Sequence, residues 1–200
     1  MAKYTAIVLS AGKGSRMGSS VHKQYLLLCG RPVIYYTLKA FEESPVDEIV
    51  LVTGEGEEEY CRKEIVEKYK LYKVTKIVKG GKERYHSVFQ GLSVCEHTDY
   101  ARPFIEQEVI RHTMDEVQKK HACIAAVPVK DTIKKVDENG KVEDTPPRKS
   151  LYTVQTPQAF SYSLIYDSYQ KMIADGREDV TDDAMVVEAY GKVPVYVIDG

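Results

Sequence analysis

The stretch YTAIVLSAGKGSRMG, residues 4–18, joins an apolar run to a loop rich in glycine and positive charge. The β-branched run over residues 4–11 predicts a buried strand, and Gly12, Gly14 and Gly18 predict a turn after it. Such a turn exposes backbone N–H groups, which attract phosphate. Arg16 and Lys23 would add full positive charges. We therefore expect an anion site at the end of the first strand.

Two known phosphate-binding motifs do not fit this loop. A mononucleotide P-loop has four residues between its glycines and a lysine directly after the second, but here Ser19 follows Gly18. The dinucleotide pattern G-x-G-x-x-G is one residue shorter than the spacing found here, and no acidic residue stands in a clear ribose-binding position after the next strand. The spacing therefore argues against a dehydrogenase.

Length and composition indicate a globular enzyme. The chain has 200 residues, of which 43% are hydrophobic and 29% charged, and its net charge of -2 argues against a general nucleic-acid binder. No apolar run approaches the roughly 20 residues that cross a bilayer, and the first apolar run leads into the glycine loop rather than a signal-peptide cleavage site. We expect one domain over residues 1–200, located in the cytoplasm, with no nucleic-acid or membrane partner.

The four cysteines are predicted to be reduced and buried. They lie about 30 residues apart and none forms a C-x-x-C pair, which argues against a zinc site. They are Cys29, Cys61, Cys95 and Cys123.

Strand patterns alternate with helix patterns along most of the chain. Strands are predicted over residues 4–11, 47–54, 74–81, 121–129 and 193–199. Helices are predicted over residues 32–44, 55–70, 83–96, 105–121, 163–176 and 182–191. This order predicts an α/β fold with a mainly parallel sheet covered on both faces. Ligands bind such sheets beyond the carboxyl ends of the strands, where the first loop and the Gly80-Gly81 turn both fall.

The segment from Lys130 to Phe160 interrupts this alternation, because it has no helical period. Asn139-Gly140 between short extended runs is a strong hairpin signal. The hairpin carries too few apolar residues to be stable alone. We expect it to lie on another surface, for which a second subunit is the natural candidate.

Several motifs together resemble those of the 2-C-methyl-D-erythritol 4-phosphate cytidylyltransferase family. They are LSAGKGSRMG, HKQYL, GGKERYHSVFQGL, ARPF, PVKDTI, VQTPQAF and TDDAMVVE, in that order along nearly the whole chain. The resemblance implies a three-layer αβα, Rossmann-like nucleotidyltransferase fold with a projecting β-arm at about residues 130–154. It also implies a homodimer formed through this arm, with active sites shared between subunits, and a requirement for Mg²⁺ or another divalent cation.

The reaction implied by the resemblance is transfer of the cytidylyl group of CTP to a sugar-alcohol phosphate. Arg16 and Lys23 would be the catalytic residues that stabilise charge in the transition state. The nucleotide would be bound by Ser10, Ala11, Gly12, Lys13, Gly14, Ser15, Gly81, Lys82 and Ser87, with Lys82 acting through its backbone. The substrate phosphate and alditol would be bound by Arg102, Thr132 and Arg148, and the metal by Asp99.

Local interpretations without a ligand compete with these roles. Arg16, Lys23 and Arg148 could be solvated surface charges, since exposed basic side chains are common. The Gly80-Gly81 segment could be a strand-end turn that leads into a helix. VQTPQAF could be merely a proline turn between strand and helix. The resemblance places it near the nucleotide site, and we assign it mainly a scaffolding role. Thr181 is interpreted as a helix N-cap, with two acids after it in the first turn.

The chain departs from the family pattern at two places. The family has a buried strand that ends in His-Asp-Gly or His-Asp-Ala directly before Ala-Arg-Pro, and about six residues of this region have no counterpart here. Asp99 falls at the position of that aspartate. Whether the strand is truly absent stays open at this stage, because a parallel sheet that loses a central strand should not fold. The family also continues beyond VIDG with an Asn-Ile-Lys stretch, whose lysine helps to hold the substrate, and a helix.

Three functions remain to be separated. The first is synthesis of CDP-methylerythritol from CTP and 2-C-methyl-D-erythritol 4-phosphate, which Ala101 in the Ala-Arg-Pro motif favours. The second is cytidylyl transfer to ribitol 5-phosphate by a related family. The third is nucleotide binding without turnover.

Overall fold

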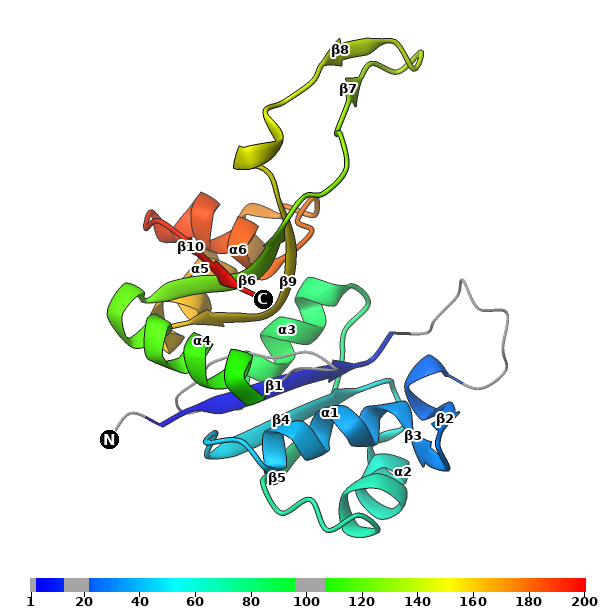
Figure 1. Cartoon of the computed structure of the whole chain (residues 1–200). Coiled ribbons are helices and arrows are strands. Elements are labelled where there is room, and N and C mark those ends of the chain that lie inside the picture. Colours follow the sequence, from blue (N-terminus) through cyan, green and yellow to red (C-terminus); the bar gives the residue numbers. More distant parts are fainter. Residues whose placement is uncertain (1–2, 13–21, 96–106) are drawn as a thin grey trace.

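The computed structural model describes residues 3–12, 22–95 and 107–200. Its helices and strands form an α/β fold in which two three-stranded sheets lie between helices, and a hairpin projects from one end (Figure 1). The predicted α/β class with mostly parallel strands is therefore confirmed.

The first sheet is fully parallel, in the order β1 (Thr5–Ser10), β4 (Glu48–Thr53) and β5 (Val74–Lys79). All six residues of β4 are buried, as expected for a central strand covered on both faces. Ser10 lies opposite Thr53, which in turn lies opposite Lys79. The carboxyl ends of the three strands are thus level along one edge.

The second sheet has β6 (Ala122–Pro128) at its centre, with β10 (Tyr196–Asp199) parallel to it and β9 (Tyr152–Phe160) antiparallel. VQTPQAF is part of β9, so the alternative of a proline turn between strand and helix is wrong. A proline lacks the N–H of a regular ladder. The strand accommodates Pro157 at an irregularity, where the register to β6 shifts between Ile124 and Ala126.

Within the described residues, no strand pair joins the two sheets. An apolar cavity lies between them, lined from the first sheet by Ala6 and from the second by Pro157 and Ala159. Residues 96–106, where the family has a further strand, lie outside the described part of the chain. The described strands therefore form two sheets rather than one continuous sheet.

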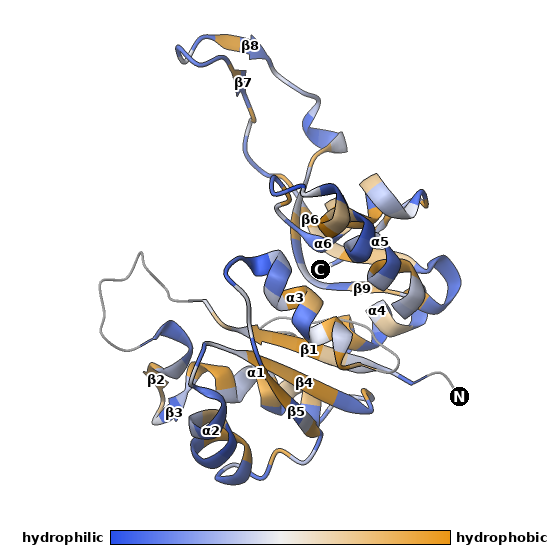
Figure 2. Cartoon of the chain, turned by 180° about the vertical axis from the view of Figure 1, so that it is seen from behind, coloured by the Kyte–Doolittle hydropathy of each residue, from blue (hydrophilic) through white to orange (hydrophobic). Residues whose placement is uncertain are grey.

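Helices cover both faces of β4, which confirms the three-layer arrangement. Ile49 and Leu51 belong to one apolar cluster with Leu38 of α1, while Val50 and Val52 belong to a second cluster with residues of α3 and α5. Figure 2 shows β1 and β4 as largely hydrophobic strands among these helices. The helices are α1 (Val33–Glu42), α2 (Glu58–Tyr60), α3 (Arg84–Ser93), α4 (Gln107–Lys120), α5 (Tyr162–Asp175) and α6 (Asp183–Val186).

Short elements complete the chain. A π-helix continues α2 as η3 (Cys61–Glu67), and another continues α6 as η5 (Val187–Gly191). Single 3-10 turns form η2 (Lys23–Tyr25) and η4 (Arg148–Ser150). A small antiparallel pair, β2 (Leu27–Leu28) and β3 (Arg31–Pro32), precedes α1.

The predicted hairpin is confirmed as a projecting arm (Figure 1). It consists of β7 (Lys135–Val136) and β8 (Val142–Asp144), and its strand residues are exposed. Gly140 has φ 79°, a conformation that favours glycine, which explains why Asn139-Gly140 marks the turn. No helix among the described residues is long and apolar enough to span a membrane.

All four cysteines are free thiols, but only three are buried. Cys29 is exposed, because it lies in the turn between β2 and β3 rather than in a core element. The prediction that all four are buried was therefore wrong for this residue.

We expect limited alkylation of the native protein to modify Cys29 much faster than Cys61. Burial raises the pKa of the Cys61 thiol to about 11, so the reactive thiolate is scarce at neutral pH. Peptide mass spectrometry after iodoacetamide treatment would measure both rates, with Cys29→Ser as the control. Equal labelling of the two cysteines in folded protein would contradict this expectation.

Candidate active site

Two loops predicted to bind nucleotide meet at the carboxyl edge of the first sheet. A Cβ at Gly80 would lie 2.5 Å from the Cβ of Ala11 and 2.8 Å from the Oγ of Ser87. The Gly80 amide also donates to the carbonyl oxygen of Thr53 at 2.8 Å. Glycine is therefore required at residue 80 for the close approach of the β1 and β5 loops.

Two buried hydroxyl groups at this edge have no hydrogen-bond partner among the residues that the structure describes. They belong to Ser10 and Thr53, which are the last residues of β1 and β4 and lie opposite each other. Buried polar groups are normally hydrogen-bonded, so unpartnered ones need an explanation. A ligand at the strand ends would provide partners for both.

The turn after β5 is held by Ser87, which is 4% exposed. Its Oγ accepts a hydrogen bond from the Gly81 amide at 3.1 Å and donates one to the carbonyl oxygen of Glu83 at 3.3 Å. A hydroxyl has one donor and two acceptor lone pairs, so this Oγ can accept one more hydrogen bond. The side chain of Lys82 is exposed.

Lys23 lies in η2, which hydrogen bonds attach to the same edge. The side chain of Gln24 donates to the carbonyl oxygen of Ser10 at 2.6 Å. The side chain of Lys23 is exposed. The structure therefore places Lys23 in a turn fastened beside Ser10. Lys13, Gly14, Ser15 and Arg16 lie outside the described residues.

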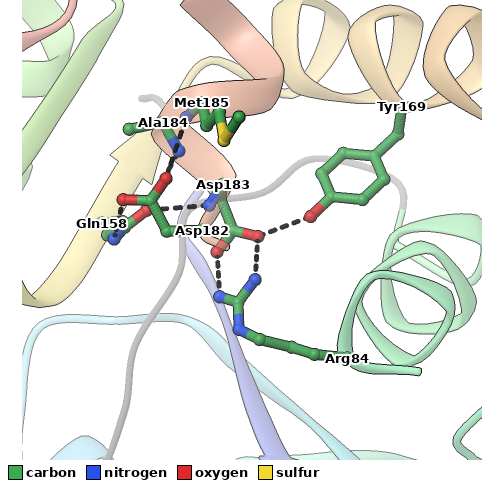
Figure 3. A network of polar contacts seen from close by, with 7 residues as sticks. All are labelled: Arg84, Gln158, Tyr169, Asp182, Asp183, Ala184 and Met185. Atoms are coloured by element: carbon green, nitrogen blue, oxygen red, sulfur yellow. Dashed lines mark hydrogen bonds and ion pairs between the residues drawn. The ribbon is translucent and has the colours of Figure 1, made fainter. Parts of the chain in front are cut away.

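A buried ion pair lies next to the turn after β5 (Figure 3). Arg84 donates from Nη1 to Asp183 Oδ1 at 2.8 Å and from Nη2 to Oδ2 at 2.6 Å, while the Tyr169 hydroxyl donates to Oδ1 at 2.5 Å. Burial lowers the pKa of Arg84, but Asp183 raises it by more, so the guanidinium stays charged. Burial, with the negative charge of Asp183, raises the pKa of Tyr169 well above its ordinary value.

The first turn of α6 is held by a second set of polar contacts (Figure 3). Asp182 is the N-cap, and its carboxylate accepts from the Met185 amide at 2.9 Å. Sequence analysis predicted Thr181 as the N-cap. The structure has the cap one residue later, at Asp182. Gln158 of β9 accepts from the amides of Asp183 and Ala184, and so supplies the partners that these helix-end amides lack within α6.

The remaining predicted site residues lie elsewhere. Thr132 and Arg148 are exposed residues of the arm, and Arg148 donates to the carbonyl oxygen of Lys130 at 2.8 Å. Arg102 and Asp99 lie outside the described residues. Sequence reasoning missed Glu57, which contacts the η2 segment, and the partnership of Arg84 with Asp183.

The described part of the chain contains no group of three or more His, Cys, Asp or Glu side chains able to hold a metal ion. Mg²⁺ commonly uses only one or two carboxylates together with substrate phosphates and water. Asp99, the predicted metal ligand, lies outside the described residues.

Comparison with known proteins gives a consistent result. The family model for 2-C-methyl-D-erythritol 4-phosphate cytidylyltransferase matches residues 4–200. The protein of that name from Lachnoclostridium phytofermentans is 46% identical over 206 residues, covering 100% of this chain and 88% of its own. Its namesake from Alkaliphilus metalliredigens is 48% identical, covering 94% of this chain and 81% of its own.

Solved structures show the same fold. The crystal structure of 4-diphosphocytidyl-2C-methyl-D-erythritol synthase from Anaerococcus prevotii has a TM-score of 0.86 and is 33% identical, covering 100% of this chain and 87% of its own.

Proposed function

The chain belongs to the 2-C-methyl-D-erythritol 4-phosphate cytidylyltransferase family, and we propose that it transfers the cytidylyl group of CTP to 2-C-methyl-D-erythritol 4-phosphate. An oxygen of the substrate phosphate attacks the α-phosphorus of CTP, the bond to the bridging oxygen of the β-phosphate breaks, and pyrophosphate leaves. The single observation that carries this proposal is the meeting of the β1 and β5 loops around Gly80 at the carboxyl edge of the first sheet.

The triphosphate would lie along the loop that follows β1. Backbone amides of this loop would contact the phosphates, and the ammonium of Lys23 and guanidinium of Arg16 would neutralise charge on the transferring group. The fastening of η2 to the Ser10 carbonyl supports this role for Lys23. No general base is required, because a phosphate monoester is already an anionic nucleophile.

Cytosine would be read by the turn after β5. Its N4 amino group is a donor, and the remaining acceptor capacity of the Ser87 hydroxyl suits a donor. Backbone groups of Gly81 and Lys82 would supply further hydrogen bonds. This division agrees with the solvent-exposed position of the Lys82 side chain.

The arm would complete the active site of a second copy of the chain in a homodimer. Its projection from the sheets and the exposure of Ile133, Val136 and Val142 support a packed interface there. Thr132 and Arg148 would then reach the partner's substrate, while Arg102 would bind the phosphate of the substrate. We also propose a cytoplasmic location, which the free thiols support.

Pyrophosphate release provides the test of this function. With CTP and Mg²⁺, we expect turnover with 2-C-methyl-D-erythritol 4-phosphate, and loss of turnover when EDTA removes the metal, with recovery on adding Mg²⁺. A divalent ion, for which Asp99 is the proposed ligand, would offset the charge of the triphosphate.

The same assay distinguishes the competing functions. Turnover with ribitol 5-phosphate alone would establish the related alditol as substrate. Calorimetric binding of CTP without turnover on either alditol phosphate would establish a non-catalytic nucleotide-binding protein. Activity that survives exhaustive chelation would contradict the metal requirement.

A further inference from the structure

The carboxylate of Glu57 connects η2 to the end of β4. Its Oε2 accepts from the Gly54 amide at 3.1 Å and from the Tyr25 hydroxyl at 2.8 Å. Its Oε1 lies 2.5 Å from Nδ1 of His22, and only 17% of the side chain is exposed. An acid beside an anion site is unfavourable unless it has partners, and these contacts provide them.

A second contact fastens η2 from the other side, where Gln24 donates to the Ser10 carbonyl at the end of β1. Thus Gln24 is tied directly to the end of β1, while His22 and Tyr25 are tied through Glu57 to Gly54, the residue after β4. Lys23 stands among them with an exposed side chain, and no described carboxylate is within ion-pair distance of it. The turn is therefore fixed while its lysine stays available to a ligand.

We propose that Glu57 is a positioning residue for Lys23, holding η2 so that the ammonium stays over the carboxyl edge of the first sheet. The inference rests on the proposed role of Lys23 in cytidylyl transfer. A lysine has a flexible four-carbon side chain, so the placement of its backbone limits where its charge can act. Misplacing a catalytic group by about 1 Å can cost roughly 100-fold in rate.

Local packing shows how closely this contact is fitted. A Cβ at Gly54 would lie 2.7 Å from Glu57 Oε2, so an alanine at residue 54 would displace the carboxylate. The Tyr25 hydroxyl also lies 3.1 Å from the Cys61 sulfur, which places the ring against the start of η3. The Glu57 contacts therefore depend on glycine at residue 54 and on the Tyr25 hydroxyl.

The test is a double-mutant cycle on turnover with Glu57→Ala, Lys23→Ala and the double variant. We expect Glu57→Ala to reduce kcat by about 10- to 100-fold with a smaller change in the KM for CTP. In the Lys23→Ala background, Glu57→Ala should lower kcat only a little further. A residue that acts through Lys23 has nothing left to position once that side chain is removed. Glu57→Gln, which keeps an oxygen acceptor, should recover part of the rate.

Controls separate positioning from general stability. Glu59→Ala removes a neighbouring, exposed glutamate that pairs with Lys63, and should leave turnover unchanged. Thermal unfolding would confirm that the variants are folded. If Glu57→Ala does not fold, the variant Tyr25→Phe takes its place in the double-mutant cycle. Tyr25→Phe removes the hydrogen bond from the Tyr25 hydroxyl to Glu57.

The outcomes distinguish this inference from the proposed function. Reductions that multiply in the double variant would overturn the positioning role while leaving Lys23 catalytic. Full activity of Glu57→Ala would also overturn the positioning role of Glu57 and leave the catalytic role of Lys23 untouched. Full activity of Lys23→Ala would instead refute the proposed role of Lys23, and the positioning role of Glu57 with it.

Discussion

Lys23→Ala is expected to lower kcat by about 100- to 1000-fold, the usual cost of losing one donor that stabilises transition-state charge. Lys23 lies in a turn attached beside Ser10, and no described carboxylate neutralises its ammonium. Negative charge gathers on the transferring phosphoryl group in the transition state. A cation available at this edge therefore stabilises the transition state more than the ground state, which lowers the barrier. Steady-state kinetics with CTP would measure the effect.

A matched control comes from the neighbouring strand end. Lys79 is the last residue of β5, but its ammonium is paired with Glu55 on the surface. Lys79→Ala should therefore have a much smaller effect than Lys23→Ala, although both remove one positive charge from the same edge. Lys23→Arg should recover only part of the rate, because arginine keeps the charge but changes its geometry. Equal effects of the two alanine changes would point to general electrostatic attraction instead of a specific contact.

The edge that carries the site was predictable from the sequence for a physical reason. Parallel strands that alternate with helices bring their carboxyl ends to one edge, so the loops after Ser10 and Lys79 were expected at the same edge of the sheet. Gly80 adds detail that sequence reasoning could not supply, because its contact with Ala11 depends on how far apart the strands are. The alternation of strands and helices thus predicts the edge at which the site lies, whereas the close approach of Gly80 to Ala11 follows from packing.

Strand β9 was missed because proline normally argues against a paired strand. Pro157 interrupts the alternating pattern, and its neighbours were interpreted as a turn. The irregular register opposite Ile124 and Ala126 shows how the strand accommodates it. Local sequence rules describe the regular ladder, whereas this strand depends on a partner some 30 positions away.

Glu57 was missed because it belongs to the acidic run EGEEE, which resembles an ordinary solvated helix start. Only the hydrogen bonds to Gly54 and Tyr25 distinguish it from the acids beside it. One signal was present in the sequence. Gly54 follows a buried strand directly, and a glycine there indicates a close approach of another group.

The pair formed by Arg84 and Asp183 leaves no local trace, since 99 positions separate the two residues. The segment TDDA, residues 181–184, contains two acids, and a helix needs only one N-cap. In the structure Asp182 is the N-cap of α6, and Asp183 binds Arg84. Helix-start rules account for an acid at either position, but they do not predict that Asp183 pairs with Arg84. The role of the second depends on which helix packs beside it.

Asp183→Ala is expected to reduce the free energy of unfolding by about 3 to 5 kcal/mol, the usual cost of removing one partner of a buried ion pair. The side chain of Asp183 is 5% exposed and that of Arg84 29%. Without the carboxylate, the fully buried Tyr169 hydroxyl and the partly exposed guanidinium of Arg84 both lose their acceptor. Urea unfolding followed by circular dichroism would measure the change.

The chain offers a surface pair of the same chemistry as the control. Arg177 donates to Asp179 at 2.6 Å and 3.2 Å, but Asp179 is 71% exposed, so Asp179→Ala should cost less than about 1 kcal/mol. Removing both Arg84 and Asp183 should cost less than the sum of the single changes, because neither partner is then left buried and unpaired. If Asp183→Ala destabilises the protein no more than Asp179→Ala does, the buried pair does not stabilise the contact between α3 and α6. That contact must then depend on apolar packing alone.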